Sequence, residues 1–135
     1  MIDKYFGFLR VHDEYAVMDS LIDHTRIDEE EIILLKEMVA FLVNHEYEKI
    51  PAHYARVRKI NEDSARVFEN VSDQIIQANF DHQKQYDLLR IHQRIDSISD
   101  LIIATAKRML IFQRINAEFP DELAKSTTEL ADALL

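Results

Sequence analysis

Three polar residues, His92, Asp96 and Asp100, follow one another at intervals of four in a segment whose apolar residues have helical spacing. At that interval the three side chains lie one turn apart on a single stripe of an α-helix. Two carboxylates so placed repel each other unless a cation or a basic side chain lies between them. Carboxylate oxygens suit hard metal ions such as magnesium, manganese and iron. The stripe therefore predicts a metal site at Asp96 and Asp100, with His92 beside it.

A charge-balanced, solvated face is the alternative interpretation of the same aspartates. Arg90, Arg94 and Lys107 are near them in the sequence and can balance their charge. The histidines do not decide between the two interpretations, because no pair of them has the His-x3-His spacing of a local zinc site. Both interpretations stay open at this point.

One long helix is expected to position this stripe. Between Asp81 and Phe112, apolar residues recur at alternating intervals of three and four, which is the pattern of a coiled-coil seam. The predicted seam consists of Leu88, Ile91, Ile95, Ile98, Ile102, Thr105, Met109 and Phe112. If Ile95 faces inward, Asp96 and Asp100 face outward. They would then form a surface carboxylate patch and not a buried pocket.

Similar apolar stripes predict that the rest of the fold is all-α. One glycine and two prolines leave few positions for tight turns, so we expect an antiparallel helical bundle with short connections. It would be a single domain over residues 1–135. We expect five helices. The first covers about residues 3–24, the second starts at Asp28, and the third starts soon after His45. The fourth follows Gln83 and ends near Asn116, and the fifth starts at Pro120. The seam of the first helix would contain Phe8, Val11, Tyr15, Met18 and Ile22.

The predicted breaks between helices have local signals. Residues 25–28 form the first break, where Asp28 and Glu31 have capping-box spacing ahead of an acidic first turn. Asn44 and His45 form the second, and Pro51 is tolerated in the first turns of the helix that follows. Residues 79–83 connect the third and fourth helices. Phe119-Pro120 ends the fourth helix and starts the fifth.

The composition limits the partners. With 16 basic and 25 acidic residues the chain carries a formal charge of −9, which disfavours nucleic acid and anionic membranes. There is no cysteine, so disulfides, thiolate metal sites and cysteine nucleophiles are excluded. The N-terminal segment lacks a signal-peptide pattern, and the most apolar windows carry charges and are too short to span a bilayer. We expect a cytoplasmic protein.

Several enzyme classes lack their motifs. No glutamate has a histidine three residues later, which excludes the usual ferritin-like di-iron centre. Gly7 is the only glycine, so a P-loop, a dinucleotide fingerprint and a nucleophile elbow are impossible. We predict no catalytic residues and a protein that is not an enzyme.

The run QYDLLRIHQRIDSISDLI resembles the signature of PhoU-like phosphate-transport regulators, in the branch associated with Pit-type phosphate transporters. Asp87, Asp96 and Asp100 match aspartates of that signature at the family's spacing. Ser97 replaces a further aspartate. Asp81-His82 stands where the family has Thr-Pro in the loop before this helix. The resemblance covers about residues 5–125.

A second helix of the family carries a Glu-x-x-x-Asp motif, and KINEDSARVFENV occupies its place here. Glu62 fits the glutamate, whereas Arg66 stands where the family has aspartate. Arg66 could pair with Glu62 or Glu69 within its helix, or with Asp96 or Asp100. The resemblance implies a metal such as iron, manganese or magnesium, with Asp96, Asp100, Glu62 and His92 as the candidate ligands.

The resemblance also implies a role and partners. It implies a regulator of phosphate uptake at the cytoplasmic membrane face, with a phosphate transporter as partner and a homo-oligomeric state. Relatives typically have two three-helix repeats, so this chain would be a shortened form. The alternative hypothesis is a structural module without ligand that dimerises through its seams and C-terminal leucines. A metal-dependent enzyme is the third and weakest hypothesis.

Overall fold

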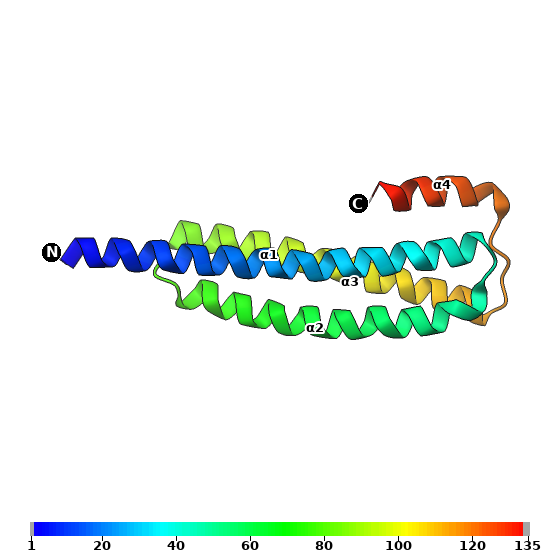
Figure 1. The fold of residues 1–135 in the computed structure, drawn as a ribbon, viewed down its shortest axis with the longest axis horizontal. Coiled ribbons are helices and arrows are strands. Elements are labelled where there is room, and N and C mark those ends of the chain that lie inside the picture. The colour runs from blue at the N-terminus through cyan, green and yellow to red at the C-terminus, as the bar shows by residue number, and fades with distance from the viewer. Residues whose placement is uncertain (1, 134–135) are drawn as a thin grey trace.

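The computed structural model describes residues 2–133, with side chains from Glu14 onward. The described chain is helical and contains no strand, which confirms the predicted all-α class (Figure 1). Its elements are α1 (Ile2–Val43), the 3-10 turn η1 (Tyr47–Lys49), α2 (Ile50–Gln77), α3 (His82–Arg114) and α4 (Asp121–Asp132).

Three long helices form an up-down-up bundle. α1 and α3 run in the same direction, and α2 runs back between their ends; each of the three contacts the other two (Figure 1). The short helix α4 turns back along the C-terminal end of α1, where Ala131 is buried and Asp132 lies 3.3 Å from the Lys36 ammonium. Most of the length of α1 has no such cover.

The predicted break at residues 25–28 is wrong, and the described chain has four α-helices where five were expected. α1 continues through this segment because nothing in it interrupts a helix: it contains neither glycine nor proline. Asp28 does not cap a helix but lies buried in the middle of one, as does Glu31. Packing of a continuous α1 against its neighbours therefore outweighs the local capping preference of Asp28.

The other predicted ends are confirmed to within a few residues, and they have clear local causes. α1 and α3 are followed by His45 and Asn116, which adopt positive φ angles of 57° and 50°. In each case the next amide donates to a carbonyl five residues back, as in a Schellman motif. Asp81 caps α3 by accepting a hydrogen bond of 2.8 Å from the Lys84 amide.

The buried stripes differ from the predicted seams. Tyr15, Met18 and Ile22 are exposed by 70, 44 and 46%, whereas Val17 and Leu21 are buried. Phe8 and Val11 lie outside the residues with described side chains. In α3 the predicted seam residues Ile91 and Ile98 are exposed by 53 and 45%. The buried stripe of α3 consists of Leu88, His92, Ile95 (in part), Ser99, Ile102, Ala106 and Met109.

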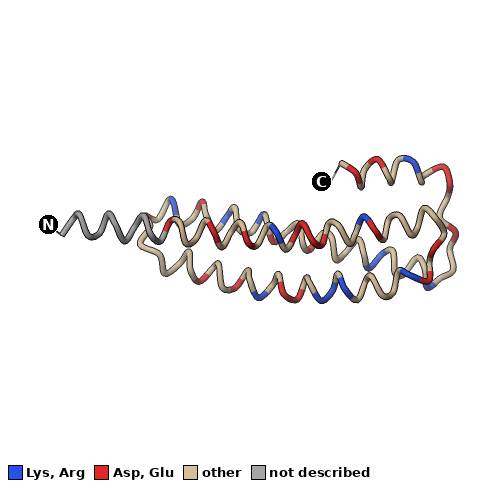
Figure 2. The backbone as a smooth tube through the Cα atoms, in the orientation of Figure 1, with Lys and Arg blue, Asp and Glu red and all other residues tan. Residues whose placement is uncertain are grey.

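The core has two apolar ends and a polar middle. One apolar cluster contains Val17, Val71 and Leu88, and the other contains Met38, Val57 and many neighbours toward η1. Between them the bundle buries a set of polar side chains. They are His24, Asp28, Glu31, Ser64, His92 and Ser99. Figure 2 shows the acidic residues that gather along the middle of α1.

Candidate functional site

All three long helices contribute to this buried polar layer. α1 supplies His24, Asp28 and Glu31, which continue the core stripe of Val17 and Leu21 at intervals of three and four. α2 supplies Ser64 together with the half-buried Asn61, and α3 supplies His92 and Ser99. The polar layer, defined by these seven residues, is thus built from core positions of each helix.

The two histidines form a hydrogen-bonded chain with one consistent set of protons. His92 Nε2 lies 2.9 Å from the Phe68 carbonyl oxygen, which only accepts, so Nε2 carries the proton. His92 Nδ1 then accepts from His24 Nδ1 at 3.4 Å. His24 Nε2 in turn accepts from the Ser64 hydroxyl at 2.9 Å. Both imidazoles are neutral in this arrangement, and both are fully buried.

Burial disfavours the charged form of His24. Burial, together with a smaller effect of the neighbouring His92, lowers the pKa of this imidazole to about 4. Phe68 stacks on His92 with a centroid distance of 4.4 Å and covers that ring. His24 therefore stays neutral at physiological pH, and the histidine pair acts as a structural hydrogen-bonding unit.

Asp28 and Glu31 are the unusual members of the layer. They are only 4% and 0% exposed, and no described residue gives a hydrogen bond of ordinary geometry to any of their four oxygens. Burial raises the pKa of Asp28 to about 6, helped by the charge of Asp96. Burial also raises the pKa of Glu31 to about 7. Such groups are expected to bind protons near neutral pH.

Other residues modify the Glu31 carboxyl. The Ser99 hydroxyl lowers its pKa, whereas the charges of Asp28, Asp100 and Asp96 raise it. Ser99 already accepts a hydrogen bond of 2.8 Å from Asn61, so its own hydroxyl hydrogen remains to be directed at Glu31. The carboxyl of Glu31 is therefore a proton-binding group inside the bundle.

The residues predicted to bind metal are spread from the interior to the surface. His92 is fully buried, Asp96 is half-buried and Asp100 is exposed, because the stripe winds around α3 from the core outward. Burial and the charge of Asp100 raise the pKa of Asp96, against an opposing effect of His92. Glu62 is exposed on α2, 3.3 Å from Arg58.

These four residues do not form a ligand set. Within the described part of the chain, no three histidine, aspartate or glutamate side chains form a group that could hold a metal ion. Both ring nitrogens of His92 are also engaged in hydrogen bonds. Arg66 pairs with Asp63 and not with the predicted Glu62, Glu69, Asp96 or Asp100. A metal at Asp96 and Asp100 remains a prediction.

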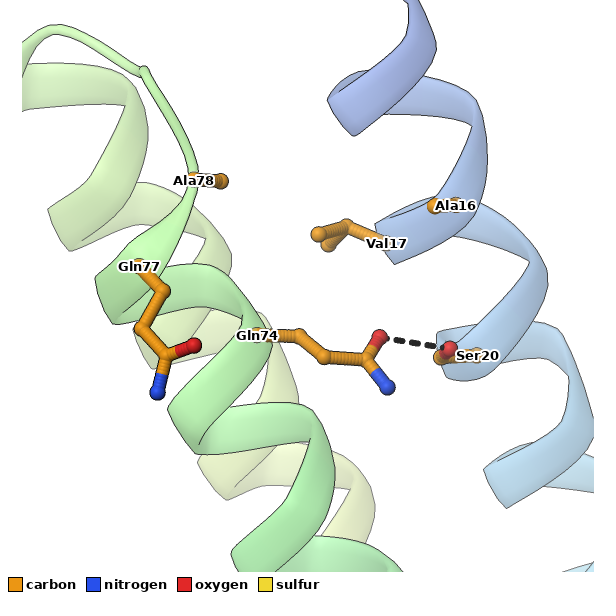
Figure 3. Close-up of a pocket in the computed structure, with 6 residues that line it drawn as sticks. All are labelled: Ala16, Val17, Ser20, Gln74, Gln77 and Ala78. Atoms are coloured by element: carbon orange, nitrogen blue, oxygen red, sulfur yellow. Dashed lines mark hydrogen bonds between the residues drawn. The ribbon is translucent and has the colours of Figure 1, made fainter.

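Several grooves flank the described part of the bundle, and two of them lie between the long helices. The first lies between α1 and α2, where the Ser20 hydroxyl donates to Gln74 Oε1 at 2.7 Å; Ala16, Val17, Gln77 and Ala78 complete its lining (Figure 3). It contains no titratable side chain among these residues. The second, which we call the α1–α3 groove, is almost entirely apolar. It is lined by Ile32, Leu35, Ile98, Leu101, Ile102 and Thr105.

Sequence reasoning missed the polar layer because it assigned Asp28 and Glu31 to a helix start. A signal for it was present: Val17, Leu21, His24, Asp28, Glu31, Leu35, Met38 and Leu42 are spaced at alternating intervals of four and three. A search for the regular interval regardless of polarity would have found this stripe.

The chain matches no family model, no curated protein and no solved structure among those compared. Its resemblance to PhoU-like regulators therefore remains a prediction. None of the described helices combines the length and apolar character needed to cross a membrane.

Proposed function

We propose that this protein is a non-enzymatic accessory protein that acts through contacts with other helices, and that the α1–α3 groove makes these contacts. The observation that carries the proposal is the exposure of apolar side chains along this groove. Leu101 is 69% exposed and Ile98 45%. Apolar residues gathered in this way are typical of interaction surfaces.

The packing of α4 against α1 indicates what kind of element fits the groove. Ile32 lies in the groove, and Lys36, Val39 and Val43, one to three turns further along the same face of α1, contact α4. In the other direction the same face carries the exposed Ile22. A helix laid along the open part of the groove would complete a four-helix bundle.

The occupant that we propose is α4 of a second copy of this chain. The outward face of α4 carries Leu123 and Leu130, which are 53% and 67% exposed and lie seven residues apart on one stripe. Exposed Arg90 and Arg94 line a separate hollow on α3, together with Ile91 and Asp87. The apolar face of α4 thus matches the apolar lining of the groove.

Exchange of this contact between two copies gives a symmetric dimer. In a two-fold arrangement with the bundles antiparallel, each copy presents its α4 to the open end of the other copy's groove. This dimer agrees with the expected homo-oligomer and with the hypothesis of a dimerisation module. It concerns protein contacts alone and requires no metal.

The role in phosphate transport rests on the resemblance. Asp87, Asp96 and Asp100 support a regulator that docks on a phosphate transporter at the cytoplasmic membrane face. The charge of −9 suits a basic loop as its docking site. We propose this role for the dimer. The role does not depend on the predicted metal at Asp96 and Asp100. Phosphate uptake by cells that lack the gene tests it: uptake identical to that of the parent strain would contradict the role.

Sedimentation of purified protein tests the proposed contact. We expect the wild type to dimerise and Leu101→Glu to remain monomeric, because a carboxylate in the apolar groove would be desolvated on association. Ile76→Glu is the matched control, since Ile76 is 57% exposed on α2 and outside the groove lining. A monomeric wild type, or a Leu101→Glu variant that dimerises like the control, would contradict the proposal.

A further inference from the structure

We infer that the polar layer is a proton-operated latch, in which protonated Asp28 and Glu31 hold α1 tightly against α2 and α3, and their ionisation loosens the bundle at this layer. The inference starts from geometry. Four carboxylate oxygens lie within the core without a hydrogen bond of ordinary geometry to a described donor, and only the Ser99 hydroxyl faces Glu31. An ionised carboxylate without partners is far more costly to bury than a neutral carboxyl group.

The surroundings of the two carboxyl groups favour the proton. From α3 they face the charges of Asp96 and Asp100, with His92 nearby in the same layer. From α2 the layer receives only Asn61, Ser64 and the Phe68 carbonyl, none of which is charged. The remaining members of the layer are His24 and Ser99, also uncharged. Every charge that acts on Asp28 and Glu31 is therefore a carboxylate.

Two arginines of α2 near this level form ion pairs at the surface. Arg58 pairs with Glu62, and Arg66 pairs with Asp63. α4 packs further along α1, at Lys36–Val43, and contributes no charge to the layer. Since no basic side chain among residues 14–133 acts on Asp28 and Glu31, a proton on each carboxyl is the simplest way to keep the layer closed.

The latch is connected to the α1–α3 groove through adjacent residues. Ile32 follows Glu31 on α1, and Ile98 precedes Ser99 on α3; both isoleucines line the groove. A movement of α1 at Glu31 would therefore shift one groove wall against the other. This second part, control of the groove by protonation, rests on the proposed function.

The direction of the pH effect follows from the signs of the shifts. The pKa of Glu31 rises from 4.5 to about 7 and that of Asp28 from 3.8 to about 6, so the folded chain holds protons that the unfolded chain releases. Their stabilising effect is complete below the ordinary values and is lost as the pH rises through 6 and 7. His24 acts in the opposite direction, because its pKa falls to about 4.

Urea unfolding at pH 6 and pH 8 tests the latch on the whole chain. Glu31→Gln keeps the shape and removes the ionisation, and Glu30→Gln is the control because Glu30 is exposed on the same helix. Between pH 6 and pH 8, the unfolding equilibrium constant of the wild type should rise by a factor about tenfold larger than that of Glu31→Gln. Glu30→Gln should behave like wild type. Equal pH dependence in all three proteins would overturn the inference.

A direct titration of the wild type covers the case in which Glu31→Gln does not fold. The carboxyl carbon signal of Glu31 in NMR spectra should titrate near pH 7, and amide exchange around Glu31 should accelerate as it does. Titration of Glu31 near its ordinary value, or exchange that does not change with pH, would contradict the latch.

Self-association then separates the latch from the proposed function. Dimer dissociation should be stronger at pH 8 than at pH 6 in the wild type, and this difference should shrink in Glu31→Gln. If the wild type is monomeric at both pH values while Glu31 titrates near 7, the groove contact fails and the latch stands. If the dimer forms equally at both pH values, control of the groove is wrong although the contact exists.

Discussion

The imidazoles of His24 and His92 meet inside the bundle with their Nδ1 atoms 3.4 Å apart. Two histidines at this distance cannot both carry a proton on Nδ1, and burial lowers the pKa of His24. The Phe68 carbonyl fixes the proton of His92 on Nε2, which leaves His92 Nδ1 as the acceptor for His24. The pair thus connects α1 and α3 through a hydrogen bond whose direction is set by the backbone of α2.

Substitution of His24 should change the stability of the bundle in acid. Because the pKa of His24 falls from 6.5 to about 4, its stabilising effect is present above pH 6.5 and is lost as the pH falls toward 4. We expect His24→Gln to lose less stability than wild type between pH 6.5 and pH 4, measured by thermal unfolding. An equal loss in both proteins would show that His24 is not responsible.

Truncation of a buried isoleucine should destabilise the bundle more than truncation of an exposed one. Ile75→Ala removes a fully buried side chain and should reduce the free energy of unfolding by about 2–5 kcal/mol. Ile98→Ala removes one that is 45% exposed and should cost less than about 1 kcal/mol at protein concentrations where the chain is monomeric. Urea unfolding measures both. Similar losses would mean that Ile98 belongs to the core after all.

The cap of α3 should contribute measurably. Asp81→Ala removes the acceptor of the Lys84 amide and should destabilise the protein by about 1 kcal/mol. Asp81→Asn keeps an acceptor and is the matched control, with a smaller expected loss. If both variants lose the same stability in urea unfolding, the side-chain cap is not the cause.

Metal binding at the predicted site should depend on Asp96 and Asp100. Calorimetric titration of the metal-stripped protein with manganese or iron(II) should then give saturable heat that Asp96→Asn/Asp100→Asn abolishes. Glu62→Gln should leave the heat unchanged, because Glu62 is exposed beside Arg58 on α2. Absence of heat from the wild type would contradict the predicted metal site. Loss of heat in Glu62→Gln would mean that Glu62 moves to join the ligands.

Helix ends could be predicted from the sequence because their causes are local. Pro51 and Pro120 fix φ wherever they stand, and Asn116 tolerates the positive φ that ends a helix. The structure places the ends of α2, α3 and α4 near these residues. The start at Asp28 was wrong for a related reason. Its capping chemistry is local and plausible, but packing of α1 against two neighbours buries Asp28 and keeps the helix continuous.

The choice between two stripes of one helix could not be predicted in this way. In α1 the apolar Tyr15, Met18 and Ile22 point outward, while His24 and Asp28 point inward. Hydrophobicity favours the first stripe, whereas the fold buries the second. The difference depends on the positions of all three helices and on which groove a further helix covers, and no local pattern contains that information.

Disulfide trapping tests the central claim, that α4 of one copy occupies the groove of another. The chain contains no cysteine, so single substitutions report on single positions. We predict that a mixture of Leu101→Cys and Leu130→Cys chains forms a cross-linked heterodimer on mild oxidation. A mixture of Ile76→Cys and Leu130→Cys should not. Equal cross-linking in the two mixtures, or none in either, would contradict the contact.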